Sequence, residues 1–193
     1  MKKISVFLTS MIVVSAICLL SCENLTVDIP VKSIELQLKD IKVLAATPSK
    51  SIELKDGDEG ETEVWYYFDE VKTIILDDLA LKKDVLDNLS KIKDATVDVV
   101  TIVITSSKSE GSLVTDFVMQ SQGLPTIEID EYVLGTEYNA NFKEFCSKLL
   151  LKLIFSNTID ITVKGNIKEI EEGETLTVTI TMGDVTFITE VTN

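Results

Sequence analysis

Residues Thr175 to Val191, TLTVTITMGDVTFITEV, form the clearest structural pattern in the chain. Aliphatic residues alternate with threonine up to Met182, and after Gly183-Asp184 the apolar residues resume at Val185. A period of two is typical of a half-buried strand, and a Gly-Asp pair supplies the positive φ angles of a tight turn. We therefore predict a hairpin in which Met182 faces Val185 across the turn and one face of the hairpin is apolar.

Weaker patterns of the same kind predict strands upstream of this hairpin. The segment from Val31 to Val43 alternates with a phase slip at Lys39-Asp40, where we expect a bulge or a turn. Val97 to Thr105 is rich in β-branched residues and is expected to be a central strand buried on both faces. Residues Thr47 to Glu63 are predicted to be a long surface connection. Further strands are expected over 64–68, 71–76, 113–120, 126–133 and 159–163.

Two helices are predicted between the strands. In the first, Leu81, Val85, Leu89 and Ile92 have helical spacing after an N-cap at Asp77-Asp78. The second opens with an approximate capping box at Asn141 and runs to about Phe155. Many short strands with turns between them indicate a mainly β protein. The expected fold is an antiparallel β-sandwich, Ig-like, with two short amphipathic helices.

The first 22 residues have the organisation of an export signal. A basic start, Met1-Lys2-Lys3, precedes an apolar run from Ile4 to Leu20 and then Ser21-Cys22. The stretch Leu19-Leu20-Ser21-Cys22 resembles the lipobox of bacterial lipoprotein precursors. The resemblance implies that residues 1–21 are a signal peptide and that Cys22 is acylated with palmitate-like chains. It also implies a place on the bacterial cell envelope, at the outer membrane if the cell is Gram-negative.

Two other interpretations of this segment remain open. A transmembrane helix over Ile4 to Leu20 would be near the lower length limit and would contain several Ser and Thr residues. An ordinary secretory signal would release an extracytoplasmic protein without a lipid. Under the lipoprotein interpretation, residues 22–30 are expected to be a tether and residues 31–193 a single β-sandwich domain.

A second resemblance concerns the middle of the chain. Ile74-Ile75-Leu76-Asp77-Asp78 leads into the first predicted helix, and Val99 to Thr105 follows it. This arrangement resembles the β-sandwich lipoproteins of unknown function that are common in Bacteroidetes. The resemblance implies an envelope location and a sandwich fold, and it assigns no site residue.

The charge of the chain narrows the range of partners. All 32 acidic residues follow the signal, whereas Lys2 and Lys3 lie within it, so the mature side chains would carry 16 positive and 32 negative charges. A net charge of −16 repels nucleic acid and anionic lipid. We therefore expect no nucleic-acid partner, and membrane contact through the acyl chains on Cys22.

The chemistry available for catalysis is limited because the chain has no His. Ser-His-Asp and Cys-His nucleophiles are excluded, and so is imidazole ligation of a metal. Cys146 falls within an apolar helical stripe and is expected to be a buried hydrophobic residue. We expect no enzyme activity, no cofactor and no metal. Acidic pairs that could act as acid and base are instead expected to solvate turns or cap a helix: Asp69-Glu70, Asp77-Asp78, Asp130-Glu131 and Glu171-Glu172.

Two other segments have both a structural and a functional interpretation. The acidic run Asp56 to Glu61 departs from EF-hand spacing at Gly60, so a solvated loop is favoured over weak calcium binding. Trp65, Tyr66 and Tyr67 would offer a carbohydrate platform if exposed. Successive strand residues point to opposite faces, so at least one of them is expected in the core.

Three functional hypotheses follow from these observations. The first is a lipid-anchored binding or scaffolding module without catalytic activity, whose partner is an envelope protein or a glycan. The second is a subunit of a surface assembly or pilus-like structure built by strand exchange. The third is a carboxylate-based enzyme acting on glycans, which requires two convergent acids in a cleft.

Overall fold

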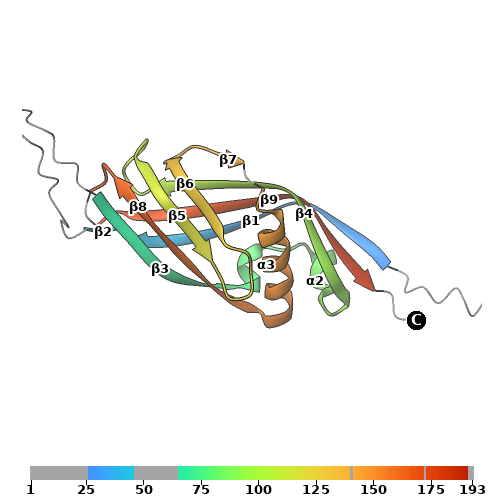
Figure 1. The fold of residues 1–193 in the computed structure, drawn as a ribbon. Coiled ribbons are helices and arrows are strands. Elements are labelled where there is room, and N and C mark those ends of the chain that lie inside the picture. The colour runs from blue at the N-terminus through green and yellow to red at the C-terminus, as the bar shows by residue number, and fades with distance from the viewer. Residues whose placement is uncertain (1–25, 46–64, 140, 172, 191–193) are drawn as a thin grey trace, which may run out of the picture.

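The computed structural model describes residues 26–45, 65–139, 141–171 and 173–190. These residues form two antiparallel β-sheets that pack against each other, with one long helix and several short helical turns (Figure 1). The mainly β sandwich predicted from the alternating patterns is confirmed. At one end of the sandwich, the first residue of the strand Thr26–Lys42 pairs with the last residue of the strand Thr175–Glu190. We call this the N-terminal end of the first sheet, because the first described strand begins there.

Every strand pair in both sheets is antiparallel. The first sheet has four strands in the order β1 (Thr26–Lys42), β9 (Thr175–Glu190), β4 (Ile92–Ser106) and β7 (Tyr138–Asn139). The second sheet has five strands in the order β2 (Leu44–Ala45), β3 (Trp65–Ile75), β8 (Thr158–Lys168), β5 (Leu113–Gln120) and β6 (Ile127–Val133).

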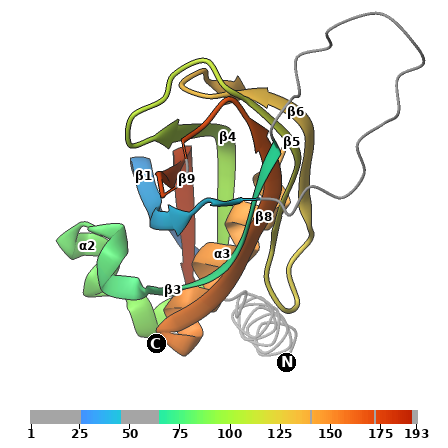
Figure 2. The same ribbon diagram turned by 90° about the vertical axis from the view of Figure 1, so that its left-hand side faces the viewer.

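Helix α3 (Lys143–Ser156) lies between β4 and β8 and closes the space between the sheets at one end (Figure 2). Its prediction is confirmed over nearly the expected range. The helix begins one residue later than expected, because its N-cap is Phe142 and not Asn141, and no side chain caps it. Its inward face is almost fully buried and consists of Phe145, Cys146, Leu149, Leu150 and Leu153.

The predicted C-terminal hairpin is wrong, because β9 continues unbroken through Gly183-Asp184. Met182 and Val185 are both buried, but they lie on one strand and not across a turn. The buried positions of β9 change from even to odd residue numbers here, and Asp184 has a φ of 50°. The break in the alternation at Gly183-Asp184 therefore marks a change in which residues face the core of a continuous strand, and not a turn.

The neighbouring strands change phase at the same level. Ile34 of β1 and Val100 of β4 are both registered with Met182, whereas Val31 and Val97 are both registered with Val185. All of these residues are buried. Because the three strands shift together, their ladder stays in register, and strand pairing on both sides of β9 stabilises the extended chain where an isolated segment would turn.

The N-terminal strand confirms one prediction and corrects another. The expected irregularity at Lys39-Asp40 is present: the β1–β9 register shifts between Leu38 and Ile41, and Asp40 has a φ of 55°. Residues 22–30 were expected to be a tether, but β1 begins at Thr26. Residues 26–30 are ordered in the sheet because they pair with residues 186–190 of β9.

The first predicted helix, up to Lys93, is also wrong as a single element. The segment forms three short turns instead: η1 (Leu76–Leu79), α2 (Lys83–Leu86) and η2 (Leu89–Lys91). Ala80 has a φ of 45°, which ends η1, and the Asn88 side chain donates to the backbone oxygen of Asp84 at 2.9 Å. The helical spacing still has a physical basis, because Val85 and Ile92 reach the core.

Two strand predictions need smaller corrections. The separate strands expected over 64–68 and 71–76 are one continuous strand, β3. The segment 97–105 is part of β4, but Asp98 and Val99 are exposed and Val103 is half-buried, so β4 is not buried on both faces. The predicted surface connection over 47–63 lies outside the described residues. No helix within the described ranges is long and apolar enough to cross a membrane.

Candidate functional site

Several predicted sites lie outside the residues that the structure describes. Cys22 and the signal segment 1–21 precede Thr26, and the acidic run 56–61 falls within the second undescribed range. The lipidation of Cys22 and calcium binding by the acidic run therefore stay predictions. The candidate site in the described residues consists of residues from β1, β9 and the segment between β3 and β4.

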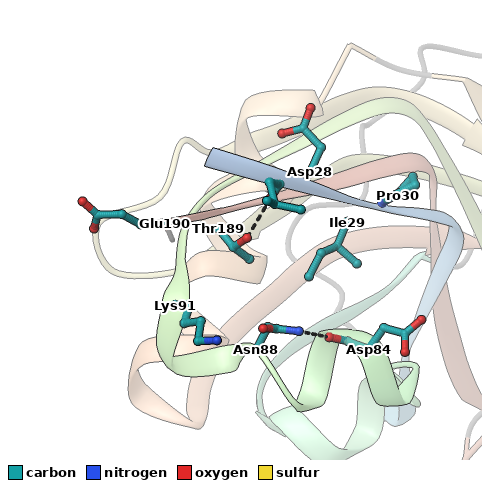
Figure 3. A pocket seen from close by; sticks show the side chains of 9 residues that line it. Asp28, Ile29, Pro30, Asp84, Asn88, Lys91, Thr189 and Glu190 are labelled. Atoms are coloured by element: carbon teal, nitrogen blue, oxygen red, sulfur yellow. Dashed lines mark hydrogen bonds between the residues drawn. The ribbon is translucent and has the colours of Figure 1, made fainter. Parts of the chain in front are cut away.

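A groove of about 540 Å³ lies at the N-terminal end of the first sheet. One wall is formed by the beginning of β1 and the end of β9, and the other by the short helical turns α2 and η2 (Figure 3). We call it the β1–α2 groove. It is lined by Val27, Asp28, Ile29, Pro30, Asp84, Asn88, Lys91, Thr189 and Glu190.

The strand wall of the groove combines apolar and polar residues. Ile29 points into the gap between the two walls, whereas the carboxylates of Asp28 and Glu190 point away from it (Figure 3). Thr189 is buried and its hydroxyl donates to the backbone oxygen of Val27 at 2.8 Å. This bond joins the first described residues of the chain to the last ones.

The helical wall of the groove is polar. Asp84, Asn88 and Lys91 are spaced at i, i+4 and i+7, and they lie in this order along the wall (Figure 3). The nearby Lys93 pairs with Glu190 at 3.4 Å, and Lys83 pairs with Asp87. Within the described part of the chain, Lys91 forms no ion pair. The groove therefore has a cationic end at Lys91 and an anionic end at Asp84.

At the opposite end of β9, the buried carboxylate of Glu174 is fully hydrogen-bonded. It accepts bonds from the hydroxyl groups of Ser106 and Ser109, and from the backbone N–H groups of Ser109 and Glu171. Burial raises its pKa, but these hydrogen bonds together outweigh burial and lower the pKa to about 2. The carboxylate holds the connection after β4 against the turn before β9, which is a structural role.

A second carboxylate ties β1 to β3 at the bulge. Glu70 accepts a hydrogen bond from the backbone N–H of Lys42 at 3.0 Å and pairs with Lys72 at 2.5 Å. The Lys72 ammonium also donates to the backbone oxygen of Asp40 at 2.8 Å. Burial raises the pKa of Glu70, whereas the bonds from Lys72 and Lys42 lower it, and the net direction is downward.

The other acidic pairs do not converge on a cleft in the described structure. Asp77, Asp78, Asp130 and Glu131 are exposed, and Asp78 accepts a hydrogen bond from the Ile75 backbone at 3.1 Å. The Asp77-Asp78 pair is not the N-cap that was expected for a helix up to Lys93, because both residues lie within η1 and the N-cap residue of α2 is Lys82. Asp78 instead pairs with the backbone of the residue that precedes its own turn. In the described ranges, no group of three or more Cys, Asp and Glu side chains is placed to hold a metal ion.

The aromatic residues at the start of β3 divide between the two faces, as predicted. Tyr66 packs against the core, whereas Tyr67 is 40% exposed. The ammonium of Lys168 lies 4.4 Å from the ring centroid of Trp65, its cross-strand partner. Because a cation already covers this ring, Trp65 does not present a free stacking surface on that side.

Cys146 is fully buried, as its position in the apolar stripe predicted. Burial raises the pKa of its thiol to about 12. A thiol with such a pKa is protonated at neutral pH and is a poor nucleophile.

The β1–α2 groove was not predicted from the sequence. Its residues come from three separate stretches, and none of them belongs to a motif. The face opposite the apolar residues of 81–92, which carries Asp84 and Lys91, was interpreted only as the polar side of an amphipathic helix. The complementary polar face, with Asp84, Asn88 and Lys91, was the only signal that could have pointed to this wall.

Comparison with known proteins does not assign the chain to a family. No family model matches the sequence, and no curated protein matches it. Among solved structures, the decameric BFDV capsid protein aligns with a TM-score of 0.35 and 10% sequence identity. The alignment covers 84% of this chain and 99% of that chain. A TM-score this low carries no functional argument.

Proposed function

We propose that this protein is a lipid-anchored lipoprotein of the bacterial cell envelope that acts as a binding or scaffolding module without catalytic activity. The observation that carries the proposal is the lipobox-like stretch Leu19-Leu20-Ser21-Cys22, placed four residues before β1 begins at Thr26. The order of segments is that of an anchored domain: an export signal, an acylated Cys and then a β-sandwich.

The short spacing constrains where the domain sits. A fully extended chain spans at most about 3.6 Å per residue, so Thr26 lies within about 15 Å of Cys22. If Cys22 is acylated, the N-terminal end of the first sheet is held at the membrane surface. The opposite end of β9, where Glu174 joins two connections, then faces away from the membrane and presents loops to a protein or glycan partner.

The role of the described carboxylates supports a binding module. Both Glu70 and Glu174 have their pKa lowered by hydrogen bonds to structural partners. A general acid at neutral pH requires a raised pKa instead. The chain also contains no His, the residue that most often provides acid–base catalysis.

Metabolic labelling with an alkyne fatty acid tests the anchor. Wild-type protein is expected to be labelled and to fractionate with the envelope membrane, whereas the Cys22→Ala variant is expected to lose the label. Cys146→Ala is the matched control, because Cys146 is buried in the core and is expected to leave labelling unchanged. Equal labelling of wild type and Cys22→Ala would overturn the anchor.

Pull-down of the mature domain against envelope proteins and glycans tests the binding role. We expect a specific partner that is retained by the wild-type domain and lost after substitutions in the exposed connections remote from Thr26. Hydrolysis of an envelope glycan by the purified protein would contradict a module without catalytic activity.

The second hypothesis, assembly by strand exchange, requires a displaceable terminal strand or an open groove in the sheet. β9 lies between β1 and β4 and is paired along both edges, which argues against its exchange. The neighbouring edge strand β1 contains Pro30 and the Asp40 bulge, two features that hinder pairing with a further strand. The described structure therefore favours the binding module over this alternative.

A further inference from the structure

We propose that the β1–α2 groove binds the head group of a zwitterionic phospholipid that carries a phosphate and a primary ammonium. This inference rests on the proposed membrane anchor and names a ligand for the end of the domain that the anchor would hold at the bilayer. The phosphate is assigned to the Lys91 end of the groove and the ammonium to the Asp84 end.

Lys91 is the phosphate-binding group. Its side chain lies along the groove wall toward Asn88 (Figure 3), and it forms no ion pair with another described residue. The neighbouring cations Lys83 and Lys93 are paired with Asp87 and Glu190. Lys91 is thus the groove-lining cation that has its charge available for an anion.

Asp84 provides the opposite charge at the other end of the same wall. Its carboxylate is exposed, and its backbone oxygen, not its side chain, accepts the hydrogen bond from Asn88. A ligand with only negative charge would meet the carboxylates of Asp84 and Asp28 without compensation, whereas the carboxylate of Glu190 is paired with Lys93. An ammonium next to the phosphate satisfies both ends of the wall, so a zwitterion fits better than an anionic lipid.

The strand wall suits the part of a lipid next to the head group. Ile29 points into the groove, and Val27 and Pro30 extend the apolar surface. Val27 is 50% exposed although it is apolar. It lies five residues after Cys22, which places this wall within about 18 Å of the acylated residue at full extension. This reach allows the wall to contact the head-group layer of the bilayer that holds the acyl chains.

Titration of soluble short-chain lipid tests the proposal without relying on the anchor. The protein is the unacylated mature chain, residues 22–193 carrying Cys22→Ser, and the probe is monomeric dihexanoyl phosphatidylethanolamine, followed by calorimetry. We expect a Kd below about 1 mM. Binding of dihexanoyl phosphatidylglycerol, which has no ammonium, is expected to be about tenfold weaker. Free phosphoethanolamine, which has no apolar part, is also expected to bind more weakly.

Matched variants separate the two ends of the groove. Lys91→Met is expected to weaken phosphatidylethanolamine binding about tenfold. Lys83→Met, which removes a nearby cation whose partner Asp87 also lies outside the groove lining, is expected to leave binding unchanged. Asp84→Asn is expected to weaken phosphatidylethanolamine binding about threefold without weakening phosphatidylglycerol binding. Asp87→Asn is its control. Circular dichroism of each variant verifies that the sandwich is folded.

The proposal would be overturned by no binding of phosphatidylethanolamine by folded wild-type protein, by equal affinities of Lys91→Met and Lys83→Met, or by equal affinities of wild type for the two lipids. Equal binding of free phosphoethanolamine would also overturn the assignment to a lipid. Fatty-acid labelling of Cys22 together with any of these results would leave the anchor intact and remove only the lipid site. Lipid binding without labelling would remove the anchor instead.

Discussion

Ser109 donates two hydrogen bonds to Glu174, one from its hydroxyl group at 2.7 Å and one from its backbone N–H at 3.1 Å. The connection after β4 and the turn before β9 are thereby joined through one buried carboxylate. Removing this charge is expected to loosen both segments at once.

The Glu174→Gln variant tests this role. An amide cannot accept all four hydrogen bonds, so donors on Ser106, Ser109 and Glu171 would lose part of their pairing. We expect the free energy of unfolding to fall by about 1–3 kcal/mol, measured by urea denaturation. Glu171→Gln is the control, because its side chain is exposed and its contact with Lys108 is 3.4 Å long. Equal stability of the two variants would contradict the role of Glu174.

The lowered pKa of Glu174 predicts a dependence on pH. Its pKa is about 2 in the folded protein, against 4.5 for an ordinary Glu. A carboxyl group with a lowered folded pKa contributes stability above its unfolded pKa, and this contribution is lost as the pH falls through the folded pKa. The stability difference between wild type and Glu174→Gln is therefore expected to be constant near neutral pH and to shrink below about pH 4.5.

Urea denaturation of both proteins at about pH 7 and about pH 3 measures this difference. Glu70, whose pKa is also lowered, provides a second test in the same direction through Glu70→Gln. A stability difference that grows on acidification would show that the sign of the Glu174 shift is wrong.

The continuous course of β9 predicts a specific sensitivity at Asp184. A φ of 50° is unfavourable for a β-branched residue and easily adopted by Gly. Asp184→Val is expected to destabilise the fold by about 1–3 kcal/mol, whereas Asp184→Asn and Asp184→Gly are expected to be close to neutral. Thermal unfolding of the three variants measures this order. Equal stability of the Val and Gly variants would argue against the observed backbone.

Burial of Cys146 predicts an unreactive thiol. In the mature chain with Cys22→Ser, Cys146 is the single Cys. With a pKa of about 12 and no exposed surface, it is expected to react slowly with a thiol reagent in the native protein and rapidly in denaturant. A native reaction as fast as the denatured one would show that α3 does not bury this residue.

The predictable part of the fold is the part governed by local alternation. The bulge at Lys39-Asp40 and the strands over 113–120 and 126–133 follow from the spacing of apolar residues, and the structure contains them. The C-terminal segment was misinterpreted because Met182 and Val185 have the same spacing in a hairpin and in a strand that changes phase. Only the neighbouring strands, with Val31 and Val97 shifted at the same level, distinguish the two.

The candidate site was less predictable than the fold. The β1–α2 groove brings together residues 27–30, 84–91 and 189–190, which are far apart in sequence and contain no motif. Residues 26–30 were expected to be part of a tether, because the segment 22–30 is short and polar in composition. Their order depends on pairing with the end of β9, which local sequence does not reveal.

Mass spectrometry of the N-terminal peptide of the protein isolated from envelope membranes tests the central claim most directly. A lipid-anchored protein is predicted to yield a peptide that begins at Cys22 and carries the added mass of acyl chains, with residues 1–21 absent. A peptide that begins upstream of Cys22, or one that contains Cys22 with a free thiol, would contradict the anchored-lipoprotein account.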